Sequence, residues 1–108
     1  MTYEEKTKKL SNFIPIYKYV TDYYYYGDRT GTIRKNVVDY KEIADKTLIA
    51  IVSIREPLLI NILLSKYVYD LSFRQISENL HYCEKQIARL HKKAVDMLCL
   101  EDVEDVQP

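Results

Sequence analysis

Apolar residues recur at steps of three and four along the second half of the chain, which is the spacing of one face of an α-helix. From Asp39 this face is expected to hold Ile43, Ala44, Thr47, Leu48, Ile51 and Ile54. A second helix is predicted from Pro57 to about Tyr69, because proline suits the first turn, where its missing amide hydrogen costs nothing. Its buried stripe is expected to be Leu58, Leu59, Ile62, Leu63 and Tyr67.

Two shorter amphipathic helices are predicted to follow, separated by only three residues. Ser72 is a good cap for a helix from Phe73 to Leu80, because its hydroxyl can accept a hydrogen bond from a free amide of the first turn. The last helix is expected from Glu84 to about Leu98 or Leu100. On a helical wheel its core face holds Ile87, Leu90, Ala94, Met97 and Leu98, and the other side holds Lys85, Arg89 and Lys92.

The upstream third of the chain is predicted to be helical up to the tyrosine cluster Tyr23 to Tyr26, with Pro15 starting or kinking the helix. The only two glycines, Gly27 and Gly31, both fall in GDRTG, which predicts a loop. We therefore expect one small all-α domain in three parts. Residues 1–38 form a Tyr-rich segment and loop suited to a partner or dimer contact, residues 39–100 form the helical binding region, and residues 101–108 form an acidic, disordered tail.

Composition changes this picture only through the distribution of charge. A chain of 108 residues fits one domain, and its formal net charge is zero. The charges are nevertheless segregated: from residue 85 to 93 there are four bases and no acid, whereas residues 96–108 contain five acids. A salt-bridged helix surface would alternate the two signs, so this pattern favours a polyanionic partner.

Candidate catalytic and metal chemistry is sparse. No Ser/His/Asp, Cys/His or paired-carboxylate set has sequence context behind it, so we expect no enzyme and no cofactor. The spacings of His81, Cys83, His91 and Cys99 are not those of zinc ligands, and His91 is expected to pack at the helix edge or touch a phosphate. With two cysteines and no apolar run of about 20 residues, we expect free thiols, no membrane partner and a cytoplasmic location.

Three helices of which the third presents a basic face form the helix-turn-helix arrangement, whose third helix enters the major groove of double-stranded DNA. The long side chains in the first half of that helix are expected to contact base edges: Lys85, Gln86 and Arg89. Phosphate contacts are expected from Lys92 and Lys93, and from Arg74 and Gln75 on the preceding helix. A homodimer on paired half-sites is also expected.

The stretch YVYDLSFRQISENLHYCEKQIARLHKKAVDML resembles region four of primary sigma factors, and more closely the small phage-encoded transcription regulators of the ArpU/RinA late-gene activator type. The resemblance covers roughly residues 41–98 and lies in the order of a serine cap, a helix, a turn and a basic helix. Ser77 stands where the family usually has alanine, and Cys83 replaces a serine or threonine cap. The resemblance implies a transcription regulator of phage or prophage late genes, acting in a bacterial host.

Two alternatives keep the fold and change the role. The first is a sigma-like module that docks on RNA polymerase or another protein, with the Tyr-rich half as its interface. The second is a DNA-packaging subunit similar to small terminases, which also carry helix-turn-helix domains and assemble into large rings.

Overall fold

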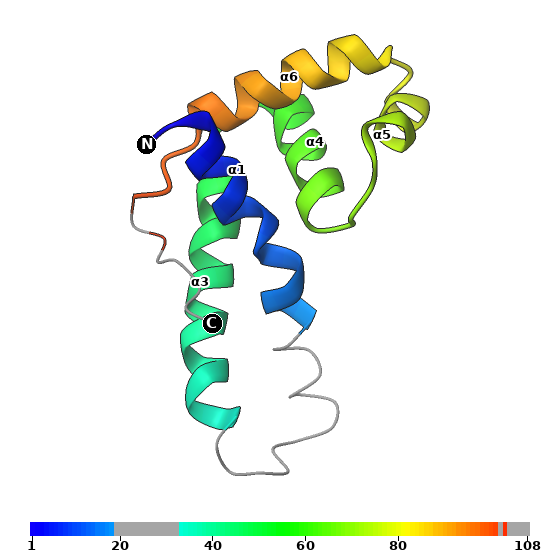
Figure 1. Ribbon diagram of the computed structural model, residues 1–108. Coiled ribbons are helices and arrows are strands. Elements are labelled where there is room, and N and C mark those ends of the chain that lie inside the picture. Colours follow the sequence, from blue (N-terminus) through cyan, green and yellow to red (C-terminus); the bar gives the residue numbers. More distant parts are fainter. Residues whose placement is uncertain (19–32, 102, 104–108) are drawn as a thin grey trace.

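Figure 1 shows the computed structural model, which describes residues 1–18, 33–101 and 103. Regular structure in these residues is entirely helical, which confirms the predicted all-α class. The helices are α1 (Tyr3–Ser11), α3 (Ile33–Val52), α4 (Pro57–Tyr67), α5 (Phe73–Leu80) and α6 (Glu84–Met97), and residues 13–18 are helical as well. The tyrosine cluster and the GDRTG loop lie outside the described residues.

Local chemistry explains most of the helix boundaries. Thr2 caps α1 by accepting a hydrogen bond from the Glu5 amide at 3.2 Å. Pro15 lies in the first turn of the helical residues 13–18, where a missing amide donor is tolerated. Helices α4, α5 and α6 begin where the sequence predicts, whereas α3 begins at Ile33 instead of Asp39. The predicted start is six residues too late, although Ile33, Val37 and Tyr40 already follow one another at helical steps of four and three.

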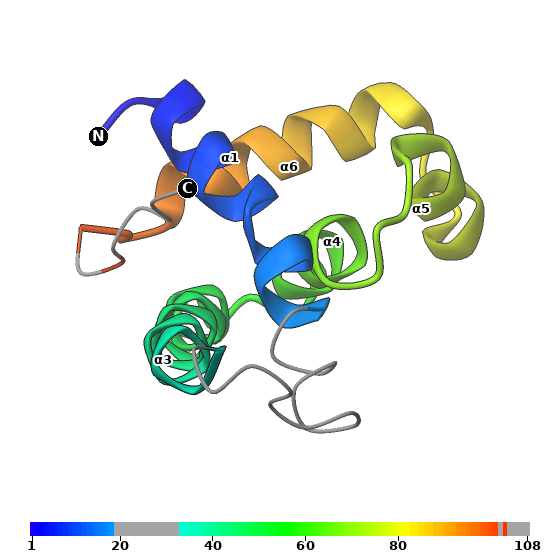
Figure 2. The ribbon, with the colours of Figure 1, turned by 60° about the horizontal axis from the view of Figure 1, so that its bottom comes forward.

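The helices are arranged around α6 (Figure 1). Helix α4 crosses beneath α6, α5 lies at the N-terminal end of α6, and α1 contacts its C-terminal half. Helix α3 contacts α4 and runs away from α6. Figure 2 shows that α3 and α5 occupy opposite sides of the molecule, with α4 between them.

A single large core joins the two ends of the chain. It draws buried side chains from the N-terminal residues, from α3, α4 and α6, and from the segment after α6: Leu10, Phe13, Ile16, Ile43, Ala44, Ile51, Leu59, Leu63, Tyr67, Ala94, Val95, Leu98, Leu100 and Val103. The N-terminal side chains of Leu10, Phe13 and Ile16 thus pack against helices of residues 39–100.

The C-terminal segment is also attached to this core. A disordered tail is predicted from residue 101, whereas Val103 is only 4% exposed. Lys9 of α1 holds the segment in place, because its Nζ donates hydrogen bonds to the carbonyl oxygens of Leu100, at 3.5 Å, and Val103. The chain therefore remains part of the fold as far as Val103.

Candidate nucleic-acid interface

The start of α5 is closed by a reciprocal pair of hydrogen bonds. The Gln75 amide donates to the Ser72 hydroxyl at 3.2 Å, and the Ser72 amide donates to the Gln75 side-chain oxygen at 2.9 Å. This capping box satisfies two backbone donors that the first helical turn leaves free. The prediction that Ser72 caps the helix is confirmed.

The turn between α5 and α6 depends on a left-handed residue. His81 follows the last residue of α5 with φ 61° and ψ 34°, a conformation that glycine adopts at much lower cost. The Ser77 hydroxyl donates a hydrogen bond to the Tyr82 carbonyl oxygen, which fastens the turn to α5. Ser77 therefore has a structural role in this chain.

A small apolar cluster fixes how α6 is presented. Ile62 of α4, Ile76 of α5 and Ile87 of α6 are each 0% exposed and pack together. Burying such a side chain contributes about 1.5–3 kcal/mol, so the three helices form one unit. With Ile87 turned inward, the opposite side of α6 faces solvent.

His91 lies at the centre of this buried side of α6 and is 3% exposed. Its Nε2 is 2.7 Å from the Tyr67 hydroxyl of α4, and its Nδ1 is 3.2 Å from the Tyr3 hydroxyl of α1. The Phe73 ring of α5 meets the imidazole edge-on at 5.0 Å between centroids. The His91 side chain thus connects four helices. It was expected either to pack at the helix edge or to touch a phosphate, and the structure shows that it packs.

The electrostatics around His91 keep it uncharged. Burial, followed by the nearby positive charge of Lys66, lowers the pKa of His91 to about 4. Burial also raises the pKa of Tyr67, with a smaller contribution from Tyr3. A neutral imidazole has one donor and one acceptor nitrogen, and each tyrosine hydroxyl can take either role, so both hydrogen bonds are satisfied.

The buried stripe of α6 differs from the predicted one at three positions. Met97, expected in the core, is 43% exposed because α6 ends there and Leu98 continues in an extended conformation. His91 and Val95 take the core positions instead. Their spacing of four residues from Ile87 onward was the signal that could have identified them.

The exposed side of α6 carries four cations: Lys85, Arg89, Lys92 and Lys93. Within the described part of the chain none of them forms an ion pair or a side-chain hydrogen bond. On an α-helix Lys85, Arg89 and Lys92 follow one another at steps of four and three, so they share a face. We call these four residues the basic face.

The remaining predicted contact residues are exposed but engaged in local interactions. Gln86 accepts a weak hydrogen bond from the Cys83 amide at 3.4 Å, and with Arg89 it lines a hollow of about 290 Å³ whose other walls are Leu58, Tyr82 and Leu90. Gln75 is held in the capping box. Arg74 lies 3.5 Å from Glu78 in an ion pair on the surface of α5.

Comparison of the chain with protein-family models, with curated proteins and with solved structures finds no match. Among the residues that the structure describes, no three His, Cys, Asp or Glu side chains gather as metal ligands would. None of the helices built from these residues combines the length and apolar character of a membrane span.

Proposed function

We propose that this protein is a sequence-specific DNA-binding transcription regulator that inserts the first half of α6 into the major groove. The observation that carries the proposal is the basic face. Its four exposed cations have no acidic partner among the described residues, and they lie on the side of α6 opposite its buried residues. Unpaired cations are free to replace the counterions condensed on DNA, and no internal ion pair has to be broken first.

The position of a side chain along α6 determines whether it contacts a base or a phosphate. Lys85, Gln86 and Arg89 lie in the first half of the helix, which is the part that reaches base edges in helix-turn-helix proteins. Lys92 and Lys93 lie one turn further along and contact phosphates. Arg74 can add a phosphate contact at small cost, because exposed ion pairs such as Arg74–Glu78 contribute only about 0–1 kcal/mol.

The sequence resemblance supplies the biological setting of the proposal. The protein acts in the cytoplasm of a bacterial host, on late genes of a phage or prophage, by binding and not by catalysis. It works as a homodimer on paired half-sites, and RNA polymerase is the second macromolecule with which it acts.

The first experiment measures binding of the purified protein to fragments of its own genome at two salt concentrations, with scrambled competitor DNA. We expect one or a few fragments to resist the competitor and to lose affinity steeply as salt rises. Arg89→Ala should weaken binding to such a fragment by about 1–3 kcal/mol and leave binding to scrambled DNA nearly unchanged.

A matched pair of double variants tests the phosphate contacts. Lys92→Gln with Lys93→Gln should lower the slope of log affinity against log salt by about 2, because each phosphate contact contributes about 0.9. Lys8→Gln with Lys18→Gln removes the same charge from exposed positions in the N-terminal helical residues and should leave the slope unchanged. Equal slopes for the two variants would contradict the assignment of the basic face.

Two other results would support the two alternative functions. Retention of RNA polymerase by a protein that selects no fragment would indicate a docking module. A large ring, recognised by its mass in solution, would indicate a packaging subunit.

A further inference from the structure

The hollow beside the first half of α6 combines apolar walls with two residues of the proposed interface. Its volume is about 290 Å³, and its walls are Leu58, Tyr82, Gln86, Arg89 and Leu90. Leu58, Tyr82 and Leu90 make the apolar part of this surface. Gln86 and Arg89 are the side chains that the proposed function assigns to base edges, so the apolar part lies directly beside them.

The apolar walls of the hollow are held in place by the core and by the turn. Leu58 and Leu90 are half-buried and pack against the small cluster that Ile87 forms with α4 and α5. Tyr82 is 38% exposed, and its carbonyl oxygen accepts the hydrogen bond from the Ser77 hydroxyl. The hollow therefore exists before a ligand arrives, and filling it requires little reorganisation.

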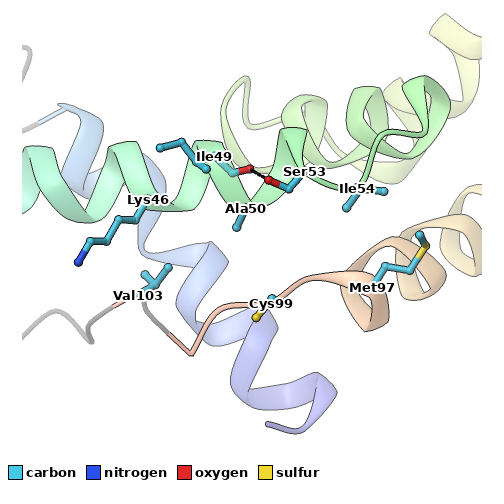
Figure 3. A pocket seen from close by; sticks show the side chains of 8 residues that line it. All are labelled: Lys46, Ile49, Ala50, Ser53, Ile54, Met97, Cys99 and Val103. Carbon is cyan, nitrogen blue, oxygen red and sulfur yellow. Dashed lines mark hydrogen bonds between the residues drawn. The ribbon is translucent and has the colours of Figure 1, made fainter.

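A larger groove, of about 670 Å³, lies between the second half of α3 and the segment that follows α6 (Figure 3). The residues that line it are not those of the proposed interface, and its cation Lys46 pairs with Glu42 at 3.1 Å. The smaller hollow differs in both respects, because Arg89 is exposed and has no ion pair among the described residues. A negatively charged ligand is therefore favoured at the smaller hollow.

The major groove of DNA presents one apolar substituent at the edges of its bases. Guanine, adenine and cytosine present hydrogen-bond donors and acceptors there, whereas thymine adds the methyl group on its C5 atom. If Gln86 and Arg89 reach base edges, the apolar walls beside them face the same row of bases. A donor or acceptor pressed against these walls would lose water without gaining a hydrogen bond, and a methyl group would not.

We propose that the hollow receives the C5 methyl group of a thymine that adjoins the base contacted by Arg89. The inference rests on the proposed function and deepens it, because it names one base of the operator. It also adds Tyr82, a residue of the turn, to the residues that determine specificity. Since arginine most often pairs with guanine in the major groove, the expected half-site places this thymine next to a guanine.

Uracil scanning of a selected DNA fragment tests the inference, because uracil differs from thymine only by lacking the methyl group. The fragment is synthesised without methylated cytosine and its thymines are replaced one at a time, so thymine is the only source of C5 methyl groups. We expect one replacement in each half-site to weaken binding about 4-fold, which corresponds to the burial of one methyl group. The slope of log affinity against log salt should not change, because an apolar contact releases no counterions.

Tyr82 allows a matched set of variants. Tyr82→Ala removes one wall of the hollow, so the thymine and uracil fragments should bind this variant equally. Tyr82→Phe keeps the ring and should keep the 4-fold effect. Both variants leave the hydrogen bond from Ser77 in place, since it goes to the backbone, and urea unfolding checks that they fold. Tyr69→Ala, at a side chain 69% exposed outside the hollow, is the control and should discriminate like the wild type.

The possible failures can be told apart. A selected fragment that tolerates uracil at every position would overturn the inference and leave the proposed function standing. A uracil effect that persists in Tyr82→Ala would also overturn it, because the methyl group would then lie elsewhere. If no fragment is selected, the proposed function and the inference both fail. Retention of RNA polymerase that Tyr82→Ala abolishes would then assign the hollow to an apolar side chain of that protein.

Discussion

Mild acid should destabilise this protein through the buried imidazole of His91. The buried imidazole has a pKa of about 4 in the folded chain, against an ordinary value of 6.5 when exposed. Between these values the unfolded chain binds a proton that the folded chain does not. The contribution of neutral His91 is therefore complete above pH 6.5 and is lost as the pH falls towards and through about 4.

The expected magnitude follows from the two pKa values. The difference between 6.5 and about 4, at 1.36 kcal/mol for each pH unit, limits the loss to about 3 kcal/mol. At pH 5, where the exposed imidazole is almost fully protonated and the buried one is not, the loss is already about 2 kcal/mol. For a domain whose free energy of unfolding is about 5–15 kcal/mol, this is a large fraction.

Urea unfolding of the wild-type chain and of His91→Gln, at pH 7.5, 6 and 5, measures this contribution. Glutamine does not titrate and can both donate to and accept from Tyr3 and Tyr67, so it is the closest non-titrating replacement. The variant should be less stable at pH 7.5, and the difference should shrink by about 2 kcal/mol at pH 5. Carboxylates common to both proteins cancel in the comparison. Parallel stability curves over this range would refute the assignment of a buried, neutral His91.

Three further changes test the frame that holds α6. Ser72→Ala should lower the free energy of unfolding by about 1 kcal/mol, measured in urea, because the capping box with Gln75 is lost; an unchanged midpoint would contradict the cap. His81→Gly should raise it by about 0.5–1 kcal/mol by relieving the left-handed backbone, whereas His81→Ala should not. Lys6→Met removes the hydrogen bond from Lys6 Nζ to the Asp96 carbonyl, 3.1 Å long, and should cost about 1.5–3 kcal/mol; wild-type stability would exclude that bond.

Much of the helical frame could be predicted because its signals are local. Pro57 at the start of α4 and Ser72 at the start of α5 act within one helical turn, so the residues themselves mark the boundaries. The same holds for Lys85, Arg89 and Lys92, whose shared face follows from helical spacing alone. The start of α3 at Ile33 was missed, although steps of four and three from Ile33 through Val37 and Tyr40 extend the apolar repeat upstream.

Interactions between distant segments could not be predicted in this way. Tyr3 and His91 are 88 residues apart, and Lys6 and Asp96 are 90 residues apart, yet both pairs form hydrogen bonds. No periodicity encodes such a contact, because the choice of partner depends on how α1 packs against α6. Arg89 and Lys92 lie close to His91 in the sequence, so its neighbours do not indicate burial. Only the tertiary structure shows that Tyr3 and Tyr67 contact it.

The sequence by itself determined where α4, α5 and α6 begin and which side of α6 carries positive charge, because helical period, caps and turns depend on neighbours within about four residues. The tertiary structure decided the rest. It buried His91 among four helices, brought Leu10 and Val103 into one core and left Ile49 and Val52 of α3 uncovered. Burial depends on which surfaces meet after the chain has folded, and that is a property of packing between helices.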